Sequence, residues 1–488
     1  MAKFYITTTT PYVNADPHIG FALEIVQADV LARFHRLLGD EIFFNTGTDE
    51  HGQKIYQKAL EAGKDPQKYC DEYAAKFDNL KFSLNLSYTN FIRTTDFHHK
   101  KAAQEFWNRC AAKGDIYKAN YKVKYCVGCE LEKTDSELTD GICPIHPNLK
   151  LEIREEENYF FKWSGYKDKL LDFYKDNPKF VVPDFRYNEL KNFVTSGLQD
   201  FSISRLKEKM PWGVEVPDDP KHVMYVWFDA LVNYISATGW PEDKKSFGAW
   251  WPGIQVAGKD NLRQQSAMWQ AMLMSADLPN TKQIMIHGFI TSGGQKMSKS
   301  RGNVVSPYDL VDKYGIDATR YYLLAKINPF EDSDFTYAKF EEAYTSDLAN
   351  GLGNLVQRVA KMAEGLNLGK LQLAGGSEAS LLKKIEPLIQ SFKFNEALDI
   401  VWSEISGIDK YINRKEVWAL PVEEKRKELR QIILGTEGIK GLRDIAEALR
   451  PFLPETAEKI EAIFQGPAVK APERPLFPRL TNLANLPN

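Results

Sequence analysis

The sequence predicts an α/β fold, in which a parallel sheet is split by an insertion and followed by an all-α bundle. Strand-like and helical segments alternate over residues 1–112, a pattern typical of parallel strands joined by crossover helices. Residues 113–222 are more irregular and contain a cluster of cysteines, and the strand pattern returns at residue 223. Beyond about residue 340 the apolar positions recur at helical spacing and strand signals nearly vanish.

The first strand is expected at Lys3–Thr10, because this segment is β-branched and aromatic. A turn-rich stretch then leads into His18-Ile19-Gly20-Phe21. Apolar residues recur at helical spacing after it, at Val26, Val30, Phe34 and Leu37. Because the free N–H groups of a helix N-terminus attract phosphate, His18 and Gly20 indicate an anion site.

Later elements are expected on the same grounds. Further strands are predicted at Ile42–Asn45, Val223–Trp227, Gly253–Gly258 and Gln283–His287. Amphipathic helices are predicted within 340–365, 378–413 and 422–466. The Pro-rich segment from Pro467 onward is expected to wrap back over the surface.

Composition favours a soluble cytoplasmic protein that does not contact a membrane. Among 488 residues, 43% are hydrophobic and 26% are charged, which is ordinary for a globular domain. The five cysteines are odd in number and clustered, unlike a secreted disulfide framework. The first strand begins almost at the N-terminus, so no targeting segment is expected. A net charge of −3 means that any RNA contact must use locally basic surface.

A second anion-binding segment is predicted at Lys296-Met297-Ser298-Lys299-Ser300, within a Gly- and Ser-rich run. Glycines free the backbone to rearrange, and two lysines bring charge to a transferring or departing phosphate. Alone, such a loop is more often a solvated basic surface. Together with His18–Phe21, however, it resembles the paired HIGH and KMSKS motifs of the class I aminoacyl-tRNA synthetases.

Within that class the chain resembles the methionyl-tRNA synthetases along essentially its whole length. The resemblance is carried by Thr46–Lys54, Tyr225–Tyr234 and Gly258–Arg263. It implies a Rossmann-like catalytic domain in two parts (1–112 and 223–290), a connective insertion (113–222) and a lysine-loop and stem-contact region (291–340). It also implies a helical anticodon-binding domain (341–488).

The resemblance also implies the ligands and the residues that hold them. ATP, with its Mg²⁺, is expected to be bound by His18, Gly20, Gly258, Lys259, Asp260, Lys296 and Lys299. Of these, His18, Lys296 and Lys299 are expected to be catalytic, because they stabilise phosphate charge. Methionine is expected to be bound by Tyr12, Asp49, Arg205, Trp227, Ala230, Leu231, Tyr234 and Gln265. Asp49 would accept from its ammonium group, and Arg205 would pair with its carboxylate.

The insertion carries a predicted structural zinc site, one per chain. Cys126-x2-Cys129 and Cys143-x2-His146 offer three thiolates and an imidazole, the ligand set of a closed tetrahedral knuckle without a catalytic position. A knuckle-shaped loop without bound metal is the alternative.

A predicted RNA-reading surface lies in the helical region. Asn354 and Arg358 share one helical face, and Trp418 offers a surface on which a base can stack. By resemblance this trio reads the anticodon of tRNA(Met), the initiator included. Without the resemblance, Trp418 would be core and the pair a solvated face. A monomer is expected, because the chain lacks the OB-fold that some relatives append.

Two positions depart from the family pattern. Phe21 stands where the upstream motif usually ends in His, and Gln264-Gln265 replaces a usual Phe-His pair. An amide at Gln265 is expected to keep a hydrogen bond to a tyrosine hydroxyl. The alternatives are a class I synthetase for leucine, valine, isoleucine or cysteine, and a non-catalytic relative that binds tRNA.

Overall fold

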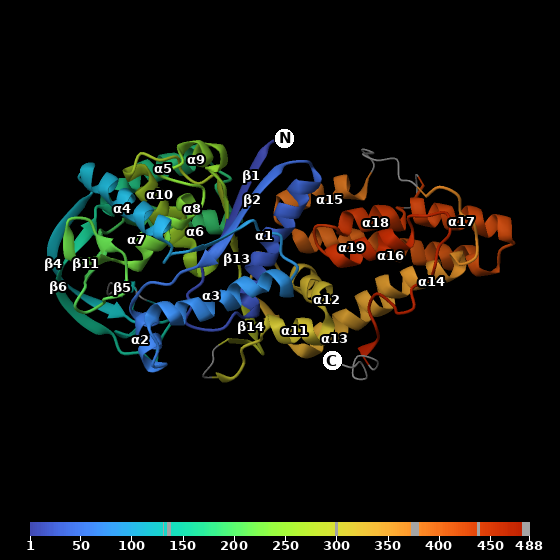
Figure 1. Cartoon of the computed structure of the whole chain (residues 1–488), viewed down its shortest axis with the longest axis horizontal. Coiled ribbons are helices and arrows are strands. Elements are labelled where there is room, and N and C mark those ends of the chain that lie inside the picture. Colours follow the sequence, from blue (N-terminus) through green and yellow to red (C-terminus); the bar gives the residue numbers. More distant parts are fainter. Residues whose placement is uncertain (130, 134–137, 298–300, 372–379, 437–439, 481–488) are drawn as a thin grey trace.

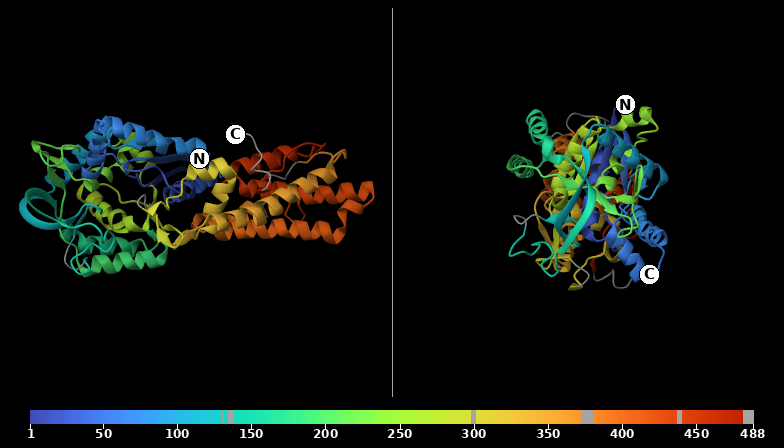
Figure 2. Two further views of the ribbon diagram at one scale, coloured as in Figure 1. Left: turned by 90° about the horizontal axis from the view of Figure 1, so that it is seen from below. Right: turned by 90° about the vertical axis from the view of Figure 1, so that its left-hand side faces the viewer.

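The computed structural model is elongated, with an α/β lobe at one end and a helical bundle at the other (Figure 1). Figure 2 shows the same two lobes from below, and its end-on view is compact. The structure describes residues 1–488 except 130, 134–137, 298–300, 372–379, 437–439 and 481–488. Within this part of the chain, no helix combines the length and the apolar composition needed to cross a membrane.

A six-stranded parallel sheet forms the centre of the α/β lobe, in the order β3-β2-β1-β12-β13-β7. Its strands are β1 (Lys3–Thr8), β2 (Glu41–Thr48), β3 (Asn90–Arg93), β7 (Val181–Val182), β12 (Ile254–Gly258) and β13 (Gln283–His287). The helices around it include α1 (Ile19–Leu37), α2 (Gln53–Glu61), α3 (Pro66–Ser83), α4 (Phe97–Ala112), α9 (Lys244–Trp250) and α10 (Trp269–Ser275). The predicted parallel sheet is thus confirmed.

The two faces of the sheet belong to two different cores. Along β1, Phe4 and Ile6 pack into one core while Tyr5 packs into the other, because successive strand residues point to opposite faces. The Phe4 core runs from α1 and α3 without a break into the helical bundle. The Tyr5 core is shared with the insertion.

The insertion is built on an antiparallel sheet of order β5-β4-β6-β8. Its strands are β4 (Ile116–Cys126), β5 (Leu131–Lys133), β6 (Glu152–Phe161) and β8 (Phe201–Ser202). The helices α5 (Lys167–Asp176) and α6 (Asp184–Ser196) lie between β6 and β8 in the chain. Figure 1 places β4 and β6 at the end of the molecule remote from the bundle.

The strand expected at Val223–Trp227 is a wrong prediction. The chain forms β11 (Asp219–Met224), which pairs antiparallel with β9 (Ser204–Leu206) and β10 (Glu215–Val216) outside the main sheet. It then turns into the short helices α7 (Val226–Ala230) and α8 (Asn233–Ser236). The apolar run is buried on all sides, and such a run has no periodicity that separates strand from helix.

After the sheet the chain crosses to the bundle. The crossing contains β14 (Ile290–Ser292), β15 (Gln295–Lys296), β16 (Ser333–Phe335), α11 (Pro307–Tyr314) and α12 (Ile316–Tyr321). The bundle consists of α13 (Tyr337–Ala343), α14 (Asn354–Ala363), α15 (Leu381–Gln390), α16 (Phe394–Lys415), α17 (Val422–Leu434), α18 (Leu442–Leu449) and α19 (Pro454–Ile463). The described part of the tail runs back along the bundle, where Tyr344 donates to the Pro478 carbonyl at 2.8 Å and Gln357 to that of Pro472 at 3.2 Å.

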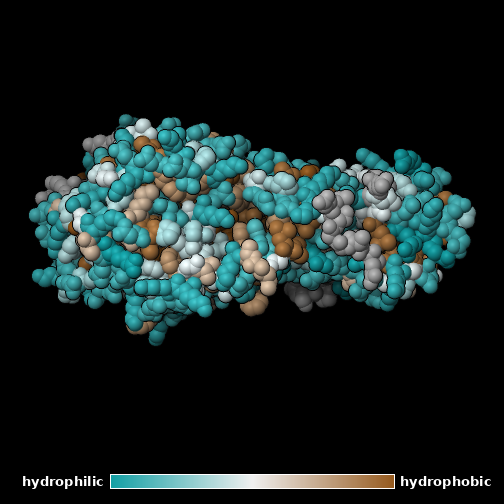
Figure 3. All heavy atoms as spheres, turned by 90° about the horizontal axis from the view of Figure 1, so that it is seen from above, coloured by the Kyte–Doolittle hydropathy of each residue, from teal (hydrophilic) through white to brown (hydrophobic). Residues whose placement is uncertain are grey.

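A buried ion pair joins the two lobes. The Arg320 guanidinium on α12 lies 2.9 Å from the Asp29 carboxylate on α1, and both side chains are fully buried. Arg320 also donates to the carbonyls of Leu84, Pro451 and Phe452 at 2.8–3.1 Å. One side chain therefore ties α1 and the end of α3 to the loop between α18 and α19. Figure 3 shows hydrophilic residues over most of the visible face, with hydrophobic ones gathered where the lobes meet.

Candidate functional site

The start of α1 presents an imidazole at the carboxyl end of β1. His18 is the N-cap of α1, and its Nδ1 accepts from the Gly20 N–H at 3.0 Å. Crowding by protein atoms lowers the pKa of His18, and the Lys296 charge lowers it further, although part of the residue stays open to solvent. A neutral imidazole that accepts at Nδ1 carries its proton on Nε2, so Nε2 is left as a hydrogen-bond donor.

The His18 geometry requires glycine at position 20. A Cβ there would lie 2.8 Å from His18 Cε1 and 2.9 Å from Nδ1. Gly20→Ala is therefore expected to displace the imidazole and lower the rate of the phosphate chemistry about 100-fold, as a 1 Å misplacement can, while the fold stays stable. Methionine-dependent ATP–pyrophosphate exchange measures this rate. Gly248→Ala, where the added Cβ meets open space, is the matched control, and equal rates in the two variants would contradict the expectation.

The described start of the lysine loop lies beside this helix start, where Met297 Cε is 4.0 Å from a Cβ placed on Gly20. The Lys296 charge acts on both His18 and Asp260, and the Ile19 N–H donates to the Val305 carbonyl at 3.1 Å. Lys296 is thus close to the predicted phosphate position. Lys299 lies outside the described residues.

The predicted nucleotide residues after β12 are only partly together. Gly258 ends the strand, and a Cβ there would lie 2.9 Å from Asp260 Oδ1. Lys259 instead turns to Asp332, with Nζ 2.6 Å from its carboxylate. Gly258 and Asp260 are therefore close together, while the Lys259 side chain is paired with Asp332.

Sequence reasoning missed a buried pair beneath this region. His287 Nε2 lies 3.0 Å from Glu24 Oε2, and Glu24 Oε1 accepts from the Thr9 backbone and hydroxyl at 2.7 and 2.6 Å. Burial alone would lower the pKa of His287, but the Glu24 carboxylate outweighs it and raises that pKa. The pair ties α1 to the ends of β1 and β13, and the only signal for it was the position of His287 at a strand end.

Several of the predicted methionine residues are linked to one another in pairs. Tyr12 and Asp49 form a backbone bridge between the loops after β1 and β2. Gln265, in the π-helical turn η4 (Gln264–Met268), donates from Nε2 to the Tyr234 hydroxyl at 2.6 Å, which confirms the expected hydrogen bond. Burial raises the pKa of Tyr234, and the nearby charges of Glu24 and Asp49 contribute to the rise.

The remaining slot residues lie on α7 and just after it. Ala230 and Leu231 are buried, and Trp227 is half-buried with an indole N–H that has no hydrogen-bond partner. Gln265 Oε1 is likewise buried without a donor. Buried polar atoms of this kind in an aromatic slot are typical of a ligand site.

Two buried charge networks hold the loop that carries Asp49. On one side Glu50 accepts from Arg93 at 2.6 and 2.9 Å. On the other, His51 Nδ1 lies 2.6 Å from Asp229, whose second oxygen lies 2.8 Å from His99. Burial alone would raise the pKa of Asp229, but the two imidazoles hold it far below its ordinary value. The two residues that follow Asp49 are therefore fixed, and the sequence motif alone did not reveal this role.

Arg205 is buried on β9. Its Nη1 donates to the Ser202 hydroxyl and the Ser204 carbonyl, both at 2.7 Å, and its guanidinium lies 4.4 Å from the centre of the Tyr225 ring. Its backbone pairs with Val223 of β11, two residues before Tyr225 and α7. This fixes the guanidinium beside the segment that forms the slot.

Phe21 packs against helix α3. Its ring meets Phe77 of α3 edge-on, with centroids 5.4 Å apart, and it packs against the apolar core. The substitution for His therefore adds an apolar contact between α1 and α3.

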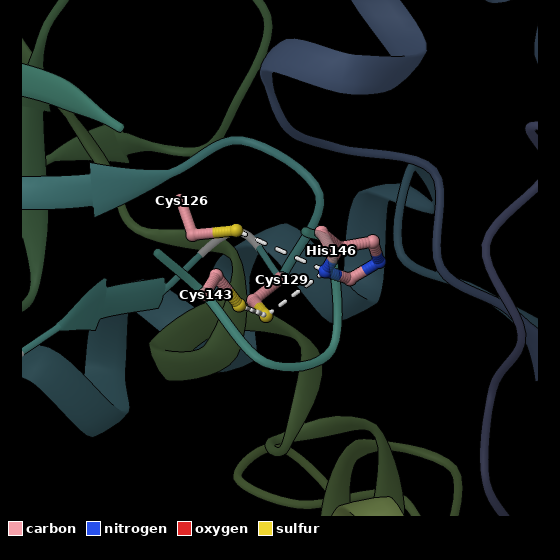
Figure 4. A group of neighbouring side chains, drawn as sticks. All are labelled: Cys126, Cys129, Cys143 and His146. Atoms are coloured by element: carbon pink, nitrogen blue, oxygen red, sulfur yellow. Dashed lines mark hydrogen bonds between the residues drawn. The ribbon is translucent and has the colours of Figure 1, made fainter. Parts of the chain in front are cut away.

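The predicted metal ligands come together in the insertion (Figure 4). The ligand atoms of Cys126, Cys129, Cys143 and His146 all lie within 4.8 Å of one another. Cys129 Sγ is 3.4 Å from Cys143 Sγ and 3.2 Å from His146 Nδ1. Three sulfurs and one nitrogen converging on one point form a site that fits a tetrahedral metal ion.

The predicted RNA-reading residues share one region of the bundle. The Arg358 guanidinium lies 5.0 Å from the centre of the Trp418 ring, and Trp418 is 46% exposed. Arg358 donates to Asp409 at 3.0 Å and to Asn413 at 2.7 Å. Asn354 is exposed one turn earlier on α14.

Comparison with known proteins agrees with this geometry. A profile of the family "tRNA synthetases class I (M)" matches residues 4–148 and 135–360. A methionine–tRNA ligase of Thermotoga maritima is 42% identical over 472 residues, covering 94% of this chain and 74% of the relative. That of Nostoc sp. PCC 7120 is 41% identical over 474 residues, covering 94% and 89%.

A solved structure is similar over nearly the whole chain. It is the Mycobacterium tuberculosis methionyl-tRNA synthetase in complex with methionyl-adenylate, with a TM-score of 0.90 and 35% identity over 98% of this chain and 100% of that one. Sequence and fold thus agree, and the chain belongs to the methionyl-tRNA synthetases of class I.

Proposed function

We propose that this chain activates L-methionine with ATP and transfers the methionyl group to the terminal ribose of tRNA(Met). Three observations support the proposal: the bridge between Tyr12 and Asp49, the hydrogen bond from Gln265 to Tyr234, and the influence of the Lys296 charge on His18. A flexible thioether suits an aromatic slot, because sulfur packs well against ring edges. Asp49 then accepts from the substrate ammonium, and Arg205 pairs with the carboxylate.

Activation needs no side-chain nucleophile. A methionine carboxylate oxygen attacks the α-phosphorus of ATP, the bond to the bridging oxygen breaks, and pyrophosphate leaves. Nε2–H of His18 and the ammonium of Lys296 face the charge that develops on the phosphates, which is where fixed donors lower a barrier most. We assign the same role to Lys299. The hydroxyl of the terminal ribose then attacks the methionyl carbonyl carbon, and AMP leaves. Mg²⁺ accompanies ATP and neutralises its phosphates.

Ribose recognition is assigned to Asp260, whose carboxylate accepts from two sugar hydroxyls, with Gly258 giving close approach and Lys259 at the edge. Asn354, Arg358 and Trp418 are assigned to the anticodon of elongator and initiator tRNA(Met). A base edge can pair with the amide and guanidinium while another base stacks on the exposed indole. We further propose that the chain works as a cytoplasmic monomer.

The test is amino-acid-dependent ATP–pyrophosphate exchange followed by aminoacylation of tRNA(Met). Exchange with methionine, and little with leucine, valine, isoleucine or cysteine, is the expected result. Exchange with another amino acid but not with methionine would overturn the assignment of methionine as the substrate. Binding of tRNA without any exchange would instead support a non-catalytic relative. The packing of Phe21 on Phe77 predicts that exchange proceeds without a second imidazole in the upstream motif.

We also propose that the Cys126–His146 cluster holds one structural Zn²⁺. Zinc would connect the end of β4 to the loop after it. The four ligands would fill its coordination sphere and leave no open position for catalysis. Gly128 is needed for space: a Cβ there would lie 2.6 Å from His146 Cγ and 2.8 Å from Leu149 Cδ1.

Gly128→Ala is therefore expected to displace His146 and weaken zinc affinity about 10- to 100-fold, as the loss of ligand support does. Metal analysis after dialysis against a graded chelator measures this affinity. Gly165→Ala, where the added Cβ has no neighbour within 4 Å, serves as the control. Zinc retention equal to the control would rule out the role of Gly128, and a wild-type chain that takes up no zinc would rule out the site.

A further inference from the structure

A cavity of about 430 Å³ lies beside Arg205, between the inserted sheet and the loop that follows Asp49. Its lining comes from five places in the chain: the start of α2, strand β4, strand β6, the β9 segment, and the entry to α7. Two of the lining side chains are the aromatic rings of Tyr125 and Tyr225, and Ile153, Met210 and Val226 add apolar surface. No residue of the methionine slot other than Arg205 lines it.

One charged side chain in this cavity is buried without a hydrogen-bond donor. Glu156 on β6 is only 8% exposed, and its Oε2 has no hydrogen-bond partner. Lys209 Nζ forms an ion pair with this oxygen at 3.6 Å, which is beyond hydrogen-bond distance. Because a buried carboxylate oxygen without a donor is costly, the site is built to receive a donor from elsewhere.

The second half-reaction places a nucleoside at this point. The terminal ribose hydroxyl has to reach the methionyl carbonyl carbon, and that carbon carries the carboxylate that we assign to Arg205. The base on the same ribose is therefore within one nucleoside of Arg205. Unstacked bases are held by aromatic rings and by hydrogen bonds to their edges, and the cavity offers both.

We propose that this cavity binds the 3′-terminal adenine of the tRNA, with the exocyclic amine of adenine donating to Glu156 Oε2. Tyr125 and Tyr225, whose ring centres lie 5.5 and 4.4 Å from the Arg205 guanidinium, border the base together with that guanidinium, and Lys209 meets the preceding phosphate. A carboxylate here accepts from the amine of adenine and disfavours uracil, which presents a carbonyl oxygen at the matching edge. The inference rests on the proposed function and specifies where its RNA substrate ends.

The test uses the full chain and two tRNA(Met) substrates that differ by one group, one ending in adenosine and one in purine riboside, which lacks the amine. For the wild-type chain, kcat/KM for aminoacylation is expected to fall about tenfold on the second substrate, because a charge-assisted hydrogen bond is lost. For Glu156→Met it is expected to be about tenfold lower with adenosine, and nearly unchanged on going to purine riboside. Methionine-dependent exchange is expected to stay within twofold.

The matched control is Glu157→Met, because Glu157 is the next residue of β6 and points to the opposite face, toward Lys118 at 3.3 Å. This variant should keep the wild-type preference for adenosine. Glu156→Gln, whose amide oxygen still accepts, should retain part of the preference and covers the case in which Glu156→Met does not fold.

Three outcomes would overturn the inference. They are equal wild-type activity on the two substrates, an unchanged preference in both Glu156 variants, and a loss of exchange as large as the loss of aminoacylation. A wild-type chain without methionine-dependent exchange would instead refute the proposed function itself, so the two failures are distinguishable.

Discussion

Asp49→Asn is expected to lower kcat/KM for methionine in ATP–pyrophosphate exchange about 100- to 1,000-fold. The substitution keeps the shape of the side chain and removes the charge that pairs with the substrate ammonium. Removing one partner of a desolvated charge pair costs about 2–5 kcal/mol, because the other charge is left buried and unpaired. The networks of Glu50 and His51 hold the loop directly after Asp49. The loop therefore has little freedom to move another carboxylate into the place of Asp49.

The loss should appear mainly in KM for methionine, with KM for ATP little changed. Asp65→Asn is the control, because Asp65 caps α3 through the Gln67 and Lys68 N–H groups and asparagine caps a helix equally well. Its kinetics should match the wild-type chain. An Asp49→Asn variant with unaltered KM for methionine would show that the ammonium is held elsewhere.

Arg320→Ala is expected to destabilise the whole chain by about 3–5 kcal/mol, the usual cost of breaking a buried ion pair. It leaves Asp29 with Arg33 as its one remaining guanidinium partner in the described structure, and it removes the donor to three buried carbonyls. Burial alone would raise the pKa of Asp29, but Arg320 and Arg33 hold it below its ordinary value. The contribution of Asp29 is therefore present above its unfolded pKa and is lost as pH falls through the lower folded pKa.

Urea unfolding followed by circular dichroism measures the change, with the free energy taken from the linear dependence on urea. Arg450→Ala is the control, since Arg450 makes a two-bond pair with Glu461 on the surface. Such surface pairs contribute about 1 kcal/mol or less. Equal unfolding midpoints for the two variants would contradict a structural role of Arg320 at the junction.

The elements that the sequence predicted correctly are those with local signals. β13 matches the predicted Gln283–His287, and His18 caps α1 as a strand–turn–helix pattern implies. The Cys126–His146 cluster forms because its spacing alone brings the ligands together. The hydrogen bond from Gln265 to Tyr234 was predictable from their chemistry.

What the sequence did not reveal depends on contacts between distant segments. Asp229 lies 178 residues from its partner His51, and His287 lies 263 residues from Glu24. No periodicity records such a pairing. The prediction of a strand at Val223–Trp227 was wrong for a different reason. A continuous apolar run has no periodicity, so its sequence does not distinguish a strand from a helix. The motif predicted that Lys259 binds ATP, whereas in the structure its ammonium group pairs with Asp332.

The ion pair between the lobes has a mechanical consequence. His18 and Asp29 lie on one continuous helix, separated by about 16 Å at 1.5 Å per residue. Helix α1 therefore connects the two positions rigidly: Arg320 holds it at Asp29, and the imidazole of His18 lies at its N-terminal end. A tilt of about 3.5° at Asp29 moves this end by about 1 Å, enough to slow chemistry about 100-fold. The adenylation rate is therefore expected to respond to small displacements of the bundle at Arg320, although this junction is remote from the residues assigned to the anticodon.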